Sequence, residues 1–400
     1  MKKTGAMLIG AGAISDTHIQ ACKSLSEQVE LLVIANRHTE AAEKKAALYG
    51  LDAQIVSDYR QMLGREDIEM VCICTPPSTH CGIAIECLNA GKHVLIEKPL
   101  AVSVEECDKI LDAAKRNGKL VSVIAQSRFH GDAMRAKKLL DDEACGRLLY
   151  AEADSVWWRD NCYYDLDWRG RWETEGGGCT LNHAVHHIDM LLWMAGRPRA
   201  VTAIMANQNH PNCEEEDIAM ALIEFKNGAV GRLTSSLLHH GQKQRMVFET
   251  QYAEITLPLG IECAKALPNG FPEKDEERWR ALNEKLSSVP EPEWTGHTGQ
   301  WANILAAIRG NEQLVVSGRD GRNAIELIDG IYESAAQGKR LVFPMTAANS
   351  FYTRDGVIAG APRFSKKTTD KASLGKGRMI LANDSYKNRE ERKNAESQYF

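Results

Sequence analysis

The opening of the chain constrains the fold more than any other stretch. Residues 6–9 form a short apolar run, typical of a buried strand, and lead directly into the sequence Gly10-Ala11-Gly12-Ala13-Ile14-Ser15. This is a G-x-G-x-x-S turn, with a small serine where the dinucleotide-binding turn usually has glycine or alanine. The first glycine permits the tight turn, and the second lets a pyrophosphate approach the main chain at the start of the next helix. The predicted cofactor contacts of this turn are Gly10, Gly12, Ala13 and Ile14.

Strand-like and helix-like segments then alternate as far as residue 124. The apolar runs are 31–34, 70–74, 93–96 and 120–124. Ser103 and Glu106 form a capping box, which predicts the start of a helix between the last two runs. Strands that alternate with helices form a parallel sheet, whose ligands bind beyond the carboxyl ends of the strands. The sequence therefore predicts an α/β Rossmann domain over residues 1–124.

The end of the second strand distinguishes between two cofactors. An acidic residue at this point would hydrogen-bond the ribose of NAD. The sequence has Asn36 and Arg37 instead. Asparagine removes the charge that would repel a 2′-phosphate, and arginine could pair with that phosphate. NADP is therefore favoured, and NAD stays open because an asparagine can also hold a ribose.

Polar residues also follow the later strands of this sheet. Lys98, in the sequence Glu97-Lys98-Pro99, could hydrogen-bond a substrate hydroxyl and lower the pKa of a neighbouring histidine. In most proteins a lysine before a proline is only a surface residue, and that interpretation stays open. The predicted cofactor contacts at these strand ends are Thr75, Pro76, His80, Glu97, Lys98 and Gln126.

A second unusual stretch runs from Gly176 to Asp189. Three consecutive glycines, which let another backbone or a ligand come close, precede a helical pattern that continues to Trp193. One face of this pattern is apolar, and a second stripe consists of Asn182, His186, Asp189 and Trp193. The pattern indicates either a site that presents an amide and an imidazole to a ligand, or a core helix whose histidines are satisfied internally.

Taken together, the Gly10 turn, Glu97-Lys98-Pro99 and the Gly176–Asp189 stretch resemble the Gfo/Idh/MocA oxidoreductases, from about residue 5 to residue 345. The resemblance implies a nicotinamide-dependent enzyme that acts on sugars, inositols and related polyols. It places the catalytic lysine at Lys98 and the catalytic histidine at His186. The family often has aspartate where this chain has Asn182, so Asn182 is expected to bind and orient the reacting groups without stabilising an imidazolium by charge.

Aromatic and arginine side chains between these motifs suit a sugar, whose C–H faces stack on rings while its hydroxyls form hydrogen bonds. Such a cluster is more often core or interface, and that alternative stays open for each ring. The predicted substrate contacts are Lys98, Arg128, Trp157, Arg159, Tyr163, Trp168, Arg169, Asn182, His183 and His186.

The remainder of the match predicts a second domain over residues 125–345. Strand-like runs at 200–206, 218–225, 229–237, 245–250 and 253–257 predict an open, mainly antiparallel sheet in an α+β domain. The resemblance implies that the exposed face of this sheet pairs subunits into a homodimer or homotetramer. Residues 346–400 form a C-terminal extension; Phe351, Tyr352 and Phe364 indicate that its first part packs against something, and the rest is interpreted as a flexible tail or an arm.

Composition excludes several other classes of protein. A net charge of −5 argues against a nucleic-acid-binding surface, and no apolar run approaches the length of a membrane helix. Eleven cysteines without a framework spacing are typical of free thiols in the cytoplasm. The residues 214–217 are interpreted as a solvated loop, and no metal site is expected there or among His183, His186, His187 and Asp189.

The sequence thus predicts an enzyme that transfers a hydride between NAD(P) and a hydroxyl-bearing carbon of a sugar, sugar derivative or cyclitol. Lys98 and His186 form the expected catalytic pair. Two alternatives stay open. The first is cleavage of a glycoside through transient oxidation and elimination, with no net turnover of the cofactor. The second is a non-catalytic sensor that binds a dinucleotide.

Overall fold

The computed structural model describes residues 2–368 and divides them into two compact units. The first unit consists of the residues up to Phe129 together with Glu293–Ile325. The second consists of His130–Pro292 and the residues from Glu326 onward. The first division lies five residues beyond the predicted boundary at 124. The predicted domains were continuous segments, so the sequence analysis did not assign residues 293–325 to the first unit.

The first unit is built on a six-stranded parallel sheet in the order β3-β2-β1-β4-β5-β6. This is the strand order of the dinucleotide-binding fold, so the predicted Rossmann domain is confirmed. Strand β3 was not expected, because its three residues hold only one buried side chain. The strands are β1 (Thr4–Ile9), β2 (Val29–Ala35), β3 (Gln54–Val56), β4 (Met70–Ile73), β5 (His93–Ile96) and β6 (Val121–Val123).

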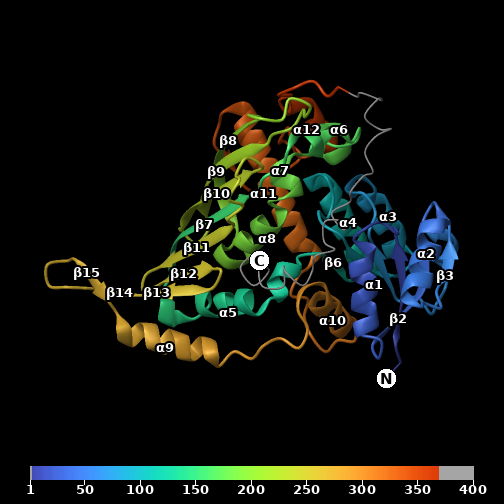
Figure 1. Cartoon of the computed structure of the whole chain (residues 1–400), viewed down its shortest axis with the longest axis horizontal. Coiled ribbons are helices and arrows are strands. Elements are labelled where there is room, and N and C mark those ends of the chain that lie inside the picture. Colours follow the sequence, from blue (N-terminus) through green and yellow to red (C-terminus); the bar gives the residue numbers. More distant parts are fainter. Residues whose placement is uncertain (1, 369–400) are drawn as a thin grey trace. The chain divides into compact units, whose positions relative to one another are not determined.

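Helices flank this sheet (Figure 1) and include one from far along the chain. The Ser103 hydroxyl accepts a hydrogen bond from the Glu106 N–H at 3.3 Å, which confirms the predicted helix start. Trp301 and Ile304, nearly 300 residues after β1, are fully buried in the same apolar cluster as Leu8. This burial explains why residues 293–325 belong to the first unit. The helices are α1 (Ser15–Ser24), α2 (Thr39–Tyr49), α3 (His80–Asn89), α4 (Val104–Asn117) and α10 (Gly296–Ile308).

The second unit contains an eight-stranded sheet in the order β13-β12-β11-β7-β10-β9-β8-β16. Its strand pairs are antiparallel except for β7 and β10, which are parallel, so the predicted open and mainly antiparallel sheet is confirmed. The strands are β7 (Leu148–Val156), β8 (Pro198–Ala206), β9 (Ile218–Phe225), β10 (Val230–Ser236), β11 (Arg245–Thr250), β12 (Glu254–Leu257), β13 (Gly260–Glu262) and β16 (Leu341–Val342).

Helices cover one face of this sheet, and the other face is open (Figure 1). Ile204 and Leu222 are each 67% exposed on the open face, and Met220 lies beside them. The other elements of the second unit are α5 (Gly131–Leu140), α6 (Trp172–Glu175), α7 (Cys179–Asn182), α8 (Val185–Ala195), α9 (Glu276–Ser287), α12 (Arg354–Gly360), β14 (Ala264–Ala266) and β15 (Pro272–Lys274). The boundary between the units falls within α11 (Gly318–Gln337).

Two predictions about local structure in the second unit were wrong. The helix expected from the glycines to Trp193 is broken into α7 and α8, because the Ala184 N–H bonds the carbonyl of Cys179, five residues back, and so widens the turn. The expected solvated loop at 214–217 is instead interior, since Glu215, Glu216 and Asp217 are fully buried.

The first part of the C-terminal extension is ordered against the second unit. Phe351 is 1% exposed and precedes α12, which confirms that this part packs. The tail expected beyond it falls largely on residues 369–400, outside the described residues. The eleven cysteines are free thiols, and within residues 2–368 no helix combines the length and apolar character required to cross a membrane.

Candidate active site

The turn after β1 forms a cradle for an anion. Gly10 has a φ of +102°, and an added Cβ would lie 2.6 Å from the Cys74 carbonyl oxygen, so only glycine fits. A Cβ on Gly12 would meet nothing within 4 Å, so the packing of the chain does not itself require this glycine. Among the described residues, the N–H groups of Gly12, Ala13 and Ile14 have no acceptor. Free N–H groups at the start of α1 fit the pyrophosphate of a dinucleotide.

Asn36 and Arg37 lie at the carboxyl end of β2, as predicted. The Asn36 amide oxygen accepts the Ala11 N–H at 3.0 Å, and its nitrogen donates to the His38 carbonyl at 2.7 Å. Asn36 therefore fixes the glycine turn directly. The Arg37 side chain is exposed and has no ion-pair partner among residues 2–368.

Glu97 supports Lys98 from inside the first unit. One carboxylate oxygen is 2.8 Å from His18 Nε2, and the other accepts the Lys98 main-chain N–H at 3.1 Å. The Trp301 indole, which can only donate, lies 3.0 Å from His18 Nδ1 and so assigns the ring proton to Nε2. Burial alone would raise the pKa of Glu97, but hydrogen bonds from His18 and His297 hold it below its usual value. The carboxylate predicted to contact cofactor is thus turned inward.

The same hydrogen bonds involve three residues of the kinds that bind metal ions. His18, Glu97 and His297 place nitrogen and oxygen atoms within 4.8 Å of one another. In the tautomer fixed by Trp301, however, one nitrogen of His18 accepts the indole N–H and the other carries a proton. Neither nitrogen has a lone pair left for a metal, so this cluster serves as a hydrogen-bonded support.

His80 is also buried inside the first unit. Its ring is fully buried, with Nδ1 2.8 Å from the Pro99 carbonyl oxygen and Nε2 2.8 Å from that of Thr75. The predicted cofactor contact of His80 is therefore replaced by a structural one. The ring joins the ends of β4 and β5, which neighbour each other on one side of β1 in the sheet. Thr75 remains partly exposed and Pro76 exposed at this edge.

The two candidates that follow β6 behave differently. The Gln126 side-chain oxygen is buried and has no hydrogen-bond donor among the described residues. An orphaned acceptor at the carboxyl edge of the sheet fits the carboxamide of a nicotinamide. Arg128 is only 2% exposed, and its guanidinium donates to the Val315 carbonyl at 3.1 Å and to Asp320 at 3.3 Å. Arg128 is thus committed to the first unit and does not line a substrate rim.

In the second unit, a carboxylate holds the run of glycines in place. Glu216 accepts the Gly178 N–H at 3.1 Å, the Thr180 N–H at 2.9 Å and the Tyr332 hydroxyl at 3.0 Å. A Cβ on Gly178 would lie 2.2 Å from the Glu216 carbonyl oxygen, and one on Gly177 would lie 2.5 Å from the Tyr332 hydroxyl. The groups that come close to these glycines are therefore Glu216 and Tyr332 of the same chain.

The histidines after the glycines lie in different environments. Asn182 ends α7 and donates to the Gly177 carbonyl at 2.6 Å, so its amide is anchored to the glycine loop. His183 Nε2 lies 3.4 Å from the Tyr163 hydroxyl. Burial lowers the pKa of His187 to about 4, which keeps it neutral. His186 is partly exposed on the first turn of α8.

The predicted aromatic and arginine residues form one cluster in the second unit. The Arg169 guanidinium lies 4.0 Å from the ring centroid of Tyr163 and 4.6 Å from that of Trp168. Arg159 lies 5.7 Å from the rings of Trp157 and Tyr163. Because Tyr163 also contacts His183, the cluster connects to the turn between α7 and α8. Trp168 is 48% exposed, which leaves a ring face available for stacking.

Two supporting groups were missed by the sequence analysis. Glu216 and Asp217 were interpreted only as part of a solvated loop. Asp217 instead accepts the N–H groups of Gln208 and Asn209 and pairs with buried His210 at 2.8 Å. The apolar residues directly after Asp217 were the available signal, because they mark the start of a strand with one buried face.

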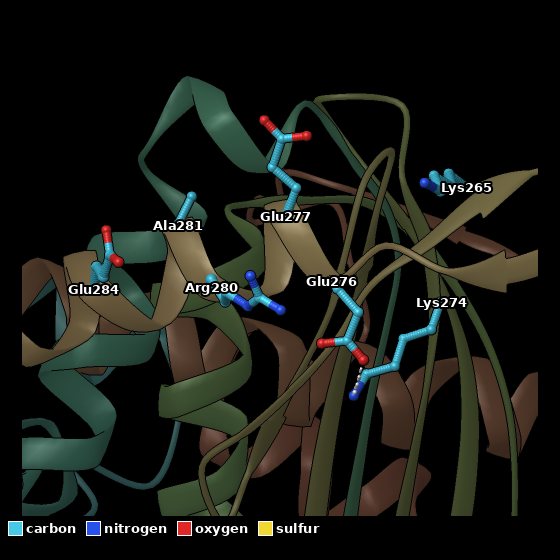
Figure 2. Close-up of a pocket in the computed structure, with 7 residues that line it drawn as sticks. All are labelled: Lys265, Lys274, Glu276, Glu277, Arg280, Ala281 and Glu284. Atoms are coloured by element: carbon cyan, nitrogen blue, oxygen red, sulfur yellow. Dashed lines mark ion pairs between the residues drawn. The ribbon is translucent and has the colours of Figure 1, made fainter.

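A hollow elsewhere in the second unit contains none of the predicted site residues. Figure 2 shows that it is lined mainly by charged side chains of α9 and the β14–β15 hairpin, with Lys274 paired to Glu276 at 3.0 Å. Three basic and three acidic side chains line it, so the hollow offers no concentrated charge of either sign to a ligand.

Comparison with known proteins agrees with this arrangement. Residues 5–125 match the family described as "Oxidoreductase family, NAD-binding Rossmann fold", and residues 133–256 match the "GFO/IDH/MocA C-terminal domain". Levoglucosan dehydrogenase of Pseudarthrobacter phenanthrenivorans is 29% identical over 269 residues, which covers 62% of this chain and 69% of that protein. The 2,7-anhydro-N-acetylneuraminate hydratase of Mediterraneibacter gnavus is 26% identical over 271 residues, with coverage of 67% and 70%.

Among solved structures, the WlbA dehydrogenase of Chromobacterium violaceum in complex with NADH and UDP-GlcNAcA is similar, with a TM-score of 0.74 and 25% identity. The match covers 86% of this chain and 97% of that one. The chain belongs to the Gfo/Idh/MocA family and is an oxidoreductase with an NAD-binding Rossmann fold.

Proposed function

We propose that the protein oxidises or reduces a hydroxyl-bearing carbon of a sugar, sugar derivative or cyclitol, with Lys98 and His186 as the catalytic pair. The observation that carries this proposal is the support of Lys98. It follows β5 at the carboxyl edge of the sheet, where the Gly12 cradle also lies, and Glu97 fixes its main chain. Ligands of this fold bind at that edge.

Bound NAD supplies a nicotinamide ring that accepts or returns the hydride. In the oxidising direction, His186 takes the proton from the substrate hydroxyl oxygen as general base. The Lys98 ammonium hydrogen-bonds the same oxygen and stabilises the negative charge that develops on it. Asn182, anchored on the Gly177 carbonyl, orients the hydroxyl. His187 is a poor general base for this step, because burial lowers its pKa to about 4 and so disfavours the protonated ring.

The class of substrate is supported from two directions. One relative is named for levoglucosan, and a similar solved structure is a complex with UDP-GlcNAcA; both compounds are carbohydrates. The Tyr163–Arg169–Trp168 cluster offers ring faces for the C–H groups of such a ligand and guanidinium donors for its oxygens. The exposed apolar residues on the open face of the second unit's sheet support assembly as a homodimer or homotetramer.

We propose further that the enzyme accepts NADP and prefers it to NAD. No carboxylate follows β2, and the exposed Arg37 side chain could pair with the 2′-phosphate. The Arg37→Ala variant should then lose efficiency with NADP and keep its efficiency with NAD. Equal use of both cofactors by the wild type and the variant would refute the preference without affecting the proposed reaction.

The test of the proposed function is absorbance at 340 nm during a screen of sugars, anhydrosugars, UDP-sugars and inositols. NAD and NADP are supplied in parallel, and the His187→Gln variant serves as the matched control for His186→Gln. Reduction of either cofactor by at least one of these compounds, abolished in His186→Gln and retained in His187→Gln, is the expected result. No reduction by any compound would contradict the dehydrogenase proposal.

A second candidate function is favoured by one relative. The hydratase of Mediterraneibacter gnavus bears a name that denotes a reaction without net oxidation, although it matches over both units. In that case the cofactor would be reduced and reoxidised within each turnover. Conversion of an anhydrosugar or glycoside, followed by mass spectrometry, without any lasting change at 340 nm would favour this candidate over the first.

A further inference from the structure

The described part of the C-terminal extension is fastened to the segment that carries the aromatic cluster. The Pro362 carbonyl accepts the Trp172 indole N–H at 3.2 Å. The Arg363 guanidinium pairs with Glu173 at 2.7 Å, and the Phe364 N–H bonds the Glu214 carbonyl at 3.0 Å. Residues 362–368 therefore form a strap, fixed by main-chain and side-chain contacts alike.

Lys367 is the strap's contact nearest to the aromatic cluster. Its side chain is 6% exposed, and its ammonium group donates to the carbonyl oxygen of Tyr164. The next residue, Thr368, bonds the Asn212 side chain at 2.9 Å. A buried lysine bound to a main-chain carbonyl fixes the position of that peptide, because leaving either group without a partner would cost desolvation free energy.

The peptide fixed by Lys367 leads directly to the proposed substrate groups. The Tyr164 ring packs edge-on against that of Tyr163, with centroids 5.1 Å apart. Tyr163 in turn contacts Arg169 and, at 3.4 Å, His183 Nε2. A contiguous chain of contacts thus runs from Lys367 through Tyr164 and Tyr163 to His183, in the turn before α8.

The extension lies outside the regions that match the family. These matches cover residues 5–125 and 133–256, and the resemblance visible in the sequence ends near residue 345. No part of the strap lies in either matched region. The contacts of residues 362–368 with the segment 164–173 therefore come from a part of the chain that neither family match covers.

We propose that the strap, through Lys367 as a positioning residue, holds the Tyr163–Arg169 segment in the conformation that binds substrate, an inference that rests on the proposed function. Loss of the strap should free this segment and weaken substrate binding. Cofactor binding and the chemical step should remain, since the residues proposed for them lie on other elements. The strap would then set the affinity for the sugar rather than the rate of hydride transfer.

Limited proteolysis tests the physical part of this proposal without any substrate. Trypsin cleavage after Arg169 and Arg171 is followed by mass spectrometry in the full chain, in Lys367→Met, and in a chain truncated after Ala361. Losing one hydrogen bond to the segment should increase its cleavage rate about fivefold, and truncation should increase it further. Exposed Lys366 gives the matched control Lys366→Met, and truncation after Thr368 leaves the strap intact; neither should change cleavage.

Steady-state kinetics with the best compound from the sugar screen test the functional part. Lys367→Met should raise KM for the sugar about fivefold, with kcat and KM for NAD unchanged, and Lys367→Arg should restore the lower KM. Unchanged cleavage in Lys367→Met and in the chain truncated after Ala361 would overturn the strap, whether or not any sugar is oxidised. Faster cleavage with an unchanged KM for the sugar would overturn the role in substrate binding.

Discussion

Replacing Gly178 by alanine should destabilise the second unit, because Glu216 occupies the space that a methyl group would need. The added Cβ would lie 2.2 Å from the Glu216 carbonyl oxygen and 2.6 Å from its Oε2. Ordinary contacts begin near 3.4 Å. The glycine loop or the start of β9 must therefore move by roughly 1 Å in an interior that is close-packed.

The cost follows from overpacking and from lost hydrogen bonds. Overpacking of this kind costs about 1–3 kcal/mol. The shift also disturbs the three hydrogen bonds that Glu216 accepts from Gly178, Thr180 and Tyr332, each worth about 1 kcal/mol. A total of about 4–6 kcal/mol corresponds to a fall in Tm of roughly 8–24 °C for a unit of this size.

Differential scanning calorimetry of the wild type and Gly178→Ala measures this fall. Gly241→Ala is the matched control, since a Cβ there would come no closer than 3.9 Å to the nearest atom, in Lys243. The reasoning requires a large loss of Tm in the first variant and almost none in the second. A Gly178→Ala protein that melts with the wild type would refute the role assigned to Glu216.

Two further predictions concern buried charge. Burial and the neighbouring Glu175 raise the pKa of Glu215 well above 4.5, so the stability that this group contributes is present at low pH and lost as pH rises through its folded-state pKa. Glu215→Gln should raise Tm at pH 8 and leave it nearly unchanged near pH 4, whereas exposed Glu277→Gln should do neither; equal shifts at both pH values would contradict the assignment. In the first unit, His18→Leu leaves Glu97 a buried carboxylate without its main partner and should cost about 3–5 kcal/mol. Trp301→Phe should lower the free energy of unfolding by about 1 kcal/mol for the missing indole hydrogen bond, in addition to what the smaller ring loses in packing. Urea unfolding measures both variants, and a larger loss in Trp301→Phe than in His18→Leu would argue against the network.

The sequence predicted those parts of the site that depend on local pattern. The turn at Gly10, the strand ends at Lys98 and Asn36, and the strands β8 to β12 of the second sheet follow from apolar periodicity and from residue types at fixed offsets. The strands β7, β13 and β16 of that sheet were not predicted. The direction of a side chain is not encoded in that way. Glu97, His80 and Arg128 are at strand ends as expected, but each points into the first unit and is held there by residues distant in the chain.

The same limit explains the errors in the second unit. Glu215 and Glu216 looked like solvated residues because four acidic residues in a row are usually exposed. Glu216 is buried because the N–H groups it accepts belong to the glycine loop, 36 to 38 residues earlier in the sequence. The break between α7 and α8 likewise depends on the hydrogen bond from the Ala184 N–H to the Cys179 carbonyl, which residue propensities do not specify.

The most direct test of the central claim is the rate of cofactor reduction in a single turnover, with NADH affinity measured in parallel by fluorescence. The compounds are those that reduce the cofactor in the screen, and the variants are Lys98→Met and His186→Asn. Loss of general acid–base or electrostatic catalysis should slow the reduction about 10²–10⁴-fold, while His186→Asn still binds NADH like the wild type. Reduction at the wild-type rate in either variant would contradict the assignment of Lys98 and His186 as the catalytic pair.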